Sequence, residues 1–131
     1  MTGIHDLDVL LRSIAPVRLP GEWVFISVPD PIADLDAAAM VRESEGVSYV
    51  VTRADADARG LGYDVPLAWI SLGVHSALDA VGLTAAVSTA LAHDGISCNV
   101  IAGAFHDHLL VPVDRADDAM SVLEALGDGG S

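Results

Sequence analysis

The second half of the chain, from Pro66 to about Leu126, alternates strand-like and helix-like segments, and this order constrains the fold more than any other feature. Short runs of β-branched and apolar residues predict strands, whereas apolar residues that recur every three or four positions predict helices. The order is therefore strand, helix, strand, tight turn, strand, helix. The predicted segments are Leu67–Val74, a helix with the stripe Leu83, Val87, Ala90 and Leu91, Ser97–Ala102, Leu109–Val113, and a helix with the stripe Ala116, Met120, Leu123 and Leu126.

The first half of the chain carries fewer clear signals. The helix-like spacing of Leu7, Leu10, Leu11 and Ile14 predicts one short amphipathic helix before Pro16. The remaining predicted segments are strands at Glu22–Val28 and Val47–Thr52, a short helix at Ala37–Arg42, and an acidic loop with at most a helical turn at Ala54–Asp64.

Strands that alternate with helices, two of them joined by a tight turn, predict an α+β sandwich of the ferredoxin-like (βαββαβ) type. The second half has the order βαββα and lacks a fourth strand. We expect the first half to supply it, from either Trp23–Val28 or Val47–Thr52. The sequence thus predicts two interdependent units, 1–62 and 63–131, neither of which folds alone.

The charged residues exclude several classes of function. The formal net charge is −13, and a surface this acidic repels phosphate backbones and anionic lipid. We therefore expect no nucleic-acid partner and no membrane partner. All six basic residues are arginine, and the absence of lysine excludes Schiff-base chemistry, covalent pyridoxal-phosphate attachment and a P-loop.

The apolar residues and the single cysteine indicate the compartment. No apolar run approaches the roughly 20 residues that span a bilayer, and the acidic first residues do not resemble a secretory signal. One cysteine, Cys98, cannot form a disulfide within the chain. We expect a cytoplasmic protein.

Two stretches of the second half resemble a known family. They are Ser76-Ala-Leu-Asp-Ala-Val-Gly-Leu-Thr-Ala-Ala-Val-Ser88 and Gly95-Ile-Ser-Cys-Asn-Val-Ile-Ala-Gly-Ala-Phe-His-Asp-His-Leu-Leu-Val-Pro112. Both are similar to the ACT-domain family of small regulatory modules, and in particular to its tandem-ACT branch of CASTOR-type amino-acid sensors and uncharacterised bacterial proteins. The resemblance implies an N-terminal ACT-like half (1–62), a C-terminal ACT domain (63–131), and a function in binding.

The resemblance also implies where a ligand would bind. In ACT domains the first strand-to-helix turn and the strand after the helix commonly form the ligand site at an interface between units or subunits. A glycine in such a turn permits close backbone approach, and the N–H groups at a helix start favour a carboxylate. The candidate ligand-binding residues are Ser48, Leu78, Asp79, Ala80, Val81, Gly82, Asn99, Ile101, Gly103 and Asp107.

Each candidate segment also has a plain structural interpretation, which the sequence leaves open. Asp79 could cap the following helix, and Asp107 could stabilise a turn. Asn99 could satisfy backbone groups at a strand end, and Ser48 could belong to an ordinary turn into a strand. The chain has Ala102-Gly103-Ala104 where the resembling sensors have an aromatic-containing loop. The resemblance therefore does not imply that arginine is the ligand of this chain.

Two functions follow from these observations. The first is a regulatory module that binds an amino acid or a related metabolite, acting as a homodimer. The alternative is a protein-interaction or regulatory subunit whose ligand site is vestigial. We expect no enzyme, because no nucleophile–base pair or phosphate loop stands out. We also expect no cofactor and no metal, because His106 and His108 have metal-like spacing but lack further ligands nearby in the sequence.

Overall fold

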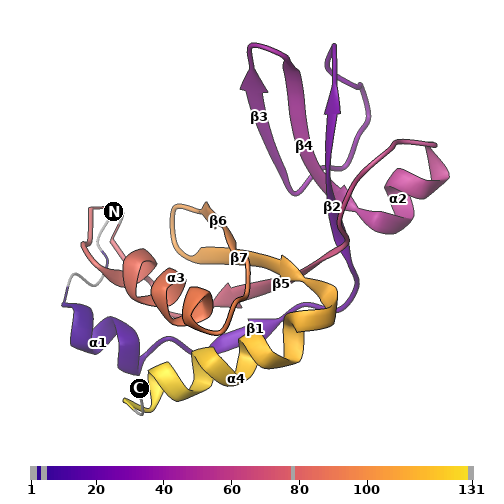
Figure 1. Cartoon of the computed structure of the whole chain (residues 1–131). Helices are drawn as coiled ribbons and strands as arrows, with labels where there is room; N and C mark the ends of the chain where they lie inside the picture. The colour runs from indigo at the N-terminus through magenta and orange to yellow at the C-terminus, as the bar shows by residue number, and fades with distance from the viewer. Residues whose placement is uncertain (1–2, 4–5, 78, 130–131) are drawn as a thin grey trace. The chain divides into compact units, whose positions relative to one another are not determined.

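The structure is a computed structural model that describes residues 3, 6–77 and 79–129, and the chain divides into two compact units (Figure 1). Unit 1 combines the residues up to Pro20 with those from Ala68 onward, and unit 2 comprises Gly21–Leu67. Unit 2 is thus inserted into the sequence of unit 1. In the described part of the chain, no helix is both long and apolar enough to cross a bilayer.

Four strands form the sheet of unit 1 in the order β1-β5-β7-β6. They are β1 (Pro16–Arg18), β5 (Leu67–Leu72, with only its first residue outside the unit), β6 (Asn99–Ala102) and β7 (Asp107–Pro112). β1 runs antiparallel to β5, with Val17 opposite Ser71, and β6 runs antiparallel to β7, with Ala102 opposite Asp107.

Three α-helices of unit 1 share one hydrophobic core with these strands (Figure 1). They are α1 (Leu7–Arg12), α3 (Leu83–His93) and α4 (Ala116–Gly127), and α4 follows a short 3₁₀ helix at Val113–Arg115. The largest fully buried side chains of this core are Leu10, Ile14, Ile70, Leu72, Val87, Leu91, Leu109, Val111 and Leu123. Most residues of the apolar stripes predicted for the helices therefore face this core, whereas Leu7 and Ala90 are only partly buried and lie outside it.

Unit 2 is a smaller sheet with one helix. Its elements are β2 (Trp23–Val28), β3 (Ala39–Glu43), β4 (Gly46–Thr52) and α2 (Arg53–Ala58). β4 lies in the centre and runs antiparallel to both β2 and β3. Alternate residues of β2 and β4 form a separate core with Ala56 of α2. Residues 29–38 connect β2 to β3 as an irregular loop.

The α+β fold with a ferredoxin-like unit is confirmed, but the source of the fourth strand was predicted wrongly. β1 supplies it, whereas Trp23–Val28 and Val47–Thr52 pair with each other in unit 2. The sequence did not predict β1, because a segment of three residues that begins with a proline is too short to show a strand pattern. The predicted boundary between 1–62 and 63–131 stays a prediction.

Two local assignments in unit 2 also differ from the sequence prediction. Residues 39–43 form a strand instead of the predicted helix at Ala37–Arg42, because pairing with β4 outweighs their weak helical propensity. The segment predicted as a loop at Ala54–Asp64 contains most of α2, whose first turn is capped by the Thr52 hydroxyl, 3.2 Å from the Asp55 amide.

Leu10→Ala should destabilise unit 1, because Leu10 has 0% of its surface exposed in the core that α1 shares with α3 and α4. Truncation of a buried leucine costs about 2–5 kcal/mol of unfolding free energy. Urea unfolding followed by circular dichroism measures the loss. Val17→Ala in β1 is the control, since Val17 is 53% exposed. An equal loss in both variants would contradict a structural role of the N-terminal segment in this core.

Candidate functional site

A small cavity in unit 1 lies where the segment after β5 meets the β6–β7 hairpin. Its volume is about 110 Å³, and its lining residues are Ser76, Ala77, Ala80, Leu83, Thr84, Ala102, Gly103 and Asp107. Three of the ten candidate residues from the sequence, Ala80, Gly103 and Asp107, belong to this lining. The strand-to-helix turn and the hairpin are therefore brought together.

Asp107 is the charged group of the cavity. Its Oδ2 accepts a hydrogen bond from the Ser76 hydroxyl at 3.2 Å. The carboxylate is half-buried and opens β7 opposite Ala102, so both side chains project to the same side of the sheet. Two carboxylate oxygens offer about four acceptor sites, which is more than one serine occupies. Asp107 can therefore accept further hydrogen bonds from a ligand.

The first residues of α3 also line this cavity. Gly82 is the N-cap residue, with φ +104°, and as a glycine it makes no side-chain cap hydrogen bond. The backbone conformation favours glycine here, and a Cβ would also lie 3.1 Å from Cδ2 of Leu7, a tight contact that the Leu7 side chain would have to relieve by shifting. Leu83 and Thr84, whose N–H groups belong to the first turn, line the cavity. Such a helix start attracts anions.

Other candidates from the strand-to-helix turn lie away from the cavity. Val81 is 83% exposed, and Asp79 is exposed in the turn before the helix. The structural interpretation of Asp79 as the helix cap is wrong, because Gly82 takes that position. Leu78 lies outside the described residues.

The remaining candidates lie on other surfaces. Ile101 pairs with His108 and Asn99 with Leu110, so these two side chains project to the sheet face opposite Asp107. Ser48 belongs to β4 of unit 2, where its hydroxyl donates a hydrogen bond to a carboxylate oxygen of Glu43. Whether Asn99, Ile101 and Ser48 contact a ligand stays a prediction.

Sequence reasoning missed two polar residues of the cavity, Ser76 and Thr84. Ser76 stands 31 positions before Asp107, and no local pattern links two residues at that separation. Thr84 lies in the first turn of α3. The amphipathic pattern of a helix predicts which residues face the core, but it does not predict which residues line a cavity. Their proximity comes from the fold alone.

A second polar group lies on the opposite face of the same sheet. Nδ1 of His108 is 2.8 Å from the Ser71 hydroxyl, which accepts a hydrogen bond from Nε1 of Trp69 at 3.0 Å. Partial burial lowers the pKa of His108, and the neighbouring His106 lowers it further, while Asp107 opposes both. The neutral imidazole is thus favoured in the folded protein.

The histidines and the cysteine form no metal-binding cluster in the described part of the chain. Nδ1 of His106 lies 3.1 Å from the carbonyl oxygen of Val74. Among the residues that the structure describes, no three metal-binding side chains cluster together. Burial raises the pKa of Cys98 to about 11, which keeps the thiol protonated at neutral pH.

Known proteins resemble this arrangement in both sequence and structure. Two family models, each described as an ACT domain, match residues 2–68 and 64–125. A Vibrio cholerae protein of unknown function, described as a possible transport protein, is 40% identical with a TM-score of 0.85, over 96% of this chain and 99% of that one. No protein with a curated description matches significantly.

Two more distant structures share the fold. A protein from Agrobacterium tumefaciens is 21% identical with a TM-score of 0.70, over 86% of this chain and 87% of that one. The regulatory subunit of aspartate kinase from Thermus thermophilus is 10% identical with a TM-score of 0.64, over 87% and 97% of the two chains.

Acidification should destabilise the protein partly through His108. Its pKa is lowered from 6.5 in the folded state, so the unfolded chain takes up the proton more readily. This contribution to stability is complete above about pH 6.5 and is lost as the pH falls through the folded pKa. Urea unfolding at a series of pH values should show a shallower pH dependence for His108→Gln than for wild type. His93→Gln, at an exposed position of α3, should keep the wild-type dependence; equal dependence in wild type and His108→Gln would contradict the prediction.

Proposed function

Since the chain belongs to the ACT-domain family, we propose that it is a regulatory module that binds an amino acid or a related metabolite and is not an enzyme. Its two ACT domains stand in tandem, as the resemblance implied, and ACT domains are generally small-molecule regulatory modules. The observation that carries the proposal is the unit 1 cavity, in which the first turn of α3 meets the carboxylate of Asp107.

The two ends of this cavity match the two charges of an amino acid. The N–H groups at the start of α3 carry partial positive charge and suit the α-carboxylate. The Asp107 carboxylate suits the α-ammonium group, which can donate a charge-assisted hydrogen bond. Ser76 holds the Asp107 side chain in place through its hydroxyl. The ligand is therefore held by its backbone atoms, whatever its side chain.

The size of the cavity supports a site that a second surface completes. Its volume of about 110 Å³ is well below the roughly 300–1,000 Å³ of ordinary ligand pockets. It accommodates the charged end of an amino acid, while the side chain extends outside it. We propose that a second copy of the chain covers that part, and Ser48 stays a candidate ligand contact.

The alternative function, an interaction or regulatory subunit with a vestigial site, draws support from the same small volume. A cavity of this size also fits a site that no longer admits a ligand. The two functions differ in whether any amino acid binds, so one binding experiment separates them.

The chain should form a symmetric homodimer. β6 ends the strand order of unit 1 and β3 ends that of unit 2, so each offers a sheet edge for pairing. A two-fold axis would pair such edges and provide a second surface for the ligand. Light scattering at micromolar concentration should give twice the chain mass of 13.5 kDa. A monomer mass with and without ligand would rule the dimer out.

At least one of the twenty amino acids should raise the melting temperature. A ligand at a hundredfold excess over its Kd adds about 2.7 kcal/mol to the unfolding free energy.

Asp107→Ala should weaken binding by about 2 kcal/mol, the lower end of the range for buried charge pairs, because Asp107 is only half-buried. Calorimetric titration of the amino acid found in the screen measures the difference.

Asp114→Ala provides the matched control for this experiment, since Asp114 is exposed and lies outside the cavity. It should bind like wild type. Equal affinities of wild type and Asp107→Ala would remove Asp107 from the site. If no amino acid shifts the melting curve at millimolar concentration, the interaction-subunit function is favoured.

A further inference from the structure

Arg42 in β3 differs from most arginines of this acidic chain, because its side chain has no ion pair within the described residues. The chain has 19 acidic residues and six arginines. Four arginines form ion pairs: Arg18 with Asp117, Arg53 with Glu22 and Asp57, Arg59 with Asp55, and Arg115 with Asp118. Arg42 pairs with Val47 through the backbone of the sheet, but its side chain forms neither a hydrogen bond nor an ion pair with the residues that the structure describes. A guanidinium group has five donors, so Arg42 is available to a partner from outside.

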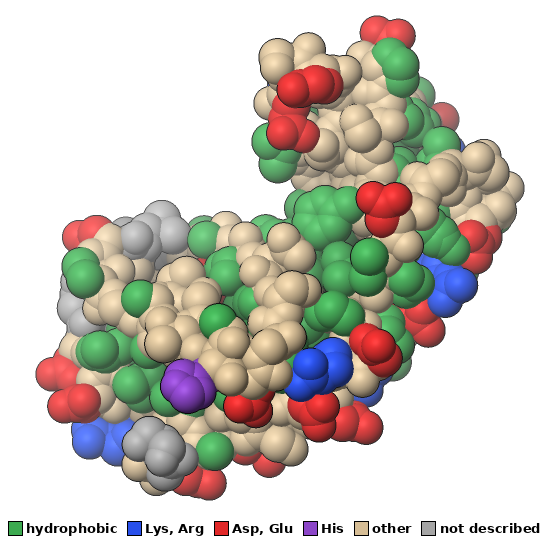
Figure 2. Space-filling view, viewed as in Figure 1, with side chains coloured by type: hydrophobic (Ala, Val, Ile, Leu, Met, Phe, Trp, Pro, Cys, Tyr) green, Lys and Arg blue, Asp and Glu red, His purple; other side chains and the backbone are tan. Residues whose placement is uncertain are grey.

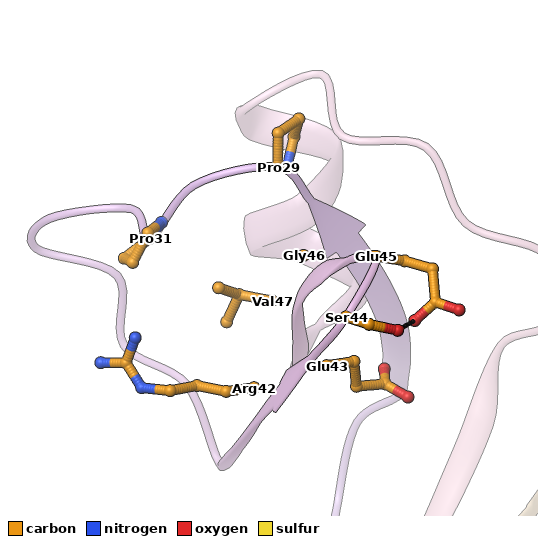
Figure 3. Close-up of a pocket in the computed structure, with 8 residues that line it drawn as sticks. All are labelled: Pro29, Pro31, Arg42, Glu43, Ser44, Glu45, Gly46 and Val47. Atoms are coloured by element: carbon orange, nitrogen blue, oxygen red, sulfur yellow. Dashed lines mark hydrogen bonds between the residues drawn. The ribbon is translucent and has the colours of Figure 1, made fainter.

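The Arg42 side chain lines a cavity of unit 2 between the loop after β2 and the β3–β4 hairpin (Figure 3). The volume of this cavity is about 300 Å³, at the lower end of the range for small-molecule sites. Its lining residues are Pro29, Pro31, Arg42, Glu43, Ser44, Glu45, Gly46 and Val47. The exposed rings of Pro29 and Pro31 form the apolar part of this lining. Val47 is only 4% exposed, because its side chain packs into the core of unit 2.

The two glutamates of the lining do not neutralise Arg42. Figure 3 shows both carboxylates turned away from the guanidinium group. The Glu43 carboxylate is turned away from Arg42 because neighbouring residues of β3 project to opposite faces of the sheet. Its carboxylate accepts a hydrogen bond from Ser48, and the Glu45 carboxylate accepts one from Ser44 at 2.9 Å. Both acidic groups therefore have serine partners, while Arg42 has none.

The walls of this cavity are held in place before any ligand arrives. Gly46 has φ +144°, and a Cβ there would collide with the carbonyl oxygen of Val28, so the hairpin packs closely against the end of β2. On the loop side, the Ile32 amide donates a hydrogen bond to the Tyr49 hydroxyl at 3.2 Å. Tyr49 is only 6% exposed and anchors the loop to β4. A preformed site loses less entropy when a ligand binds.

We propose that this cavity binds a small molecule that carries a carboxylate next to an apolar group. The planar fork of Arg42 would hold the carboxylate through two parallel hydrogen bonds, and Pro29 and Pro31 would contact the apolar group. This site lies in unit 2 and does not depend on the amino-acid site proposed in unit 1. A branched monocarboxylate, isobutyrate, has the required chemistry and serves as the probe.

Nuclear magnetic resonance tests the proposal on the intact chain labelled with ¹⁵N. The six arginine Nε–H signals can be assigned by substitution, and the signal of Arg42 should move saturably as isobutyrate is added. Isobutyramide has the same shape without the charge and should leave the signal in place. Inorganic phosphate separates a carboxylate site from a general anion contact, and it should bind more weakly than isobutyrate.

Two variants complete the test. Arg42→Lys keeps the positive charge but loses the fork, and it should weaken isobutyrate binding about tenfold or more. Arg12→Lys is the matched control, because Arg12 is also exposed and has no ion pair within the described residues. It should bind like wild type, and amide spectra should show that both variants are folded.

Four outcomes would overturn the proposal. They are the absence of a saturable shift at Arg42, equal binding of isobutyramide, phosphate binding as tight as that of isobutyrate, and undiminished affinity in folded Arg42→Lys. None of these outcomes affects the unit 1 site, which the amino-acid screen and Asp107→Ala test separately.

Discussion

Unit 1 depends on the pairing of its N-terminal segment with β5. Unit 2 separates this segment from the rest of unit 1 in the sequence, so the pairing is what completes the unit. β1 pairs with β5, and the contact continues beyond the strands, with the Leu19 amide 2.9 Å from the Trp69 carbonyl oxygen and the Gly73 amide 2.9 Å from that of Ile14. The same segment buries Leu10 in the core. Since Gly73 begins the loop that leads to the cavity, this pairing also positions the candidate site.

The two units place a cavity at corresponding points of their chains but provide different donors there. In each unit, the loop after one strand lies beside a β-hairpin formed by the next two strands. Unit 1 follows its loop with α3, whose first turn has backbone N–H groups without partners inside the helix. Unit 2 has the irregular loop 29–38 at that point and thus no helix start. The unpaired Arg42 supplies positive charge in its place. We infer that the two sites differ in ligand because the donor differs.

The sequence predicted the elements that carry their own periodicity. The stripe Leu83, Val87 and Leu91 is buried as expected, because an amphipathic helix needs no knowledge of its neighbours. β1 and β3 were missed because each becomes a strand only through its partner. The same limit applies to the candidate site. Alternation separates Asn99 and Ile101 from Ala102, but only the register with β7 shows that Asp107 shares the face of Ala102.

The acidic surface repels anions at long range, so both proposed sites depend on short-range contacts to hold a ligand. On the face shown in Figure 2, acidic side chains are scattered over both units, while basic ones form a few isolated patches. With a net charge of −13, the protein repels an anion at long range, although salt screens this repulsion beyond about 8 Å at physiological ionic strength. A zwitterionic amino acid has no net charge and approaches unit 1 without this penalty. A monocarboxylate must overcome it before it reaches Arg42, so its binding depends on the short-range hydrogen bonds of the guanidinium fork.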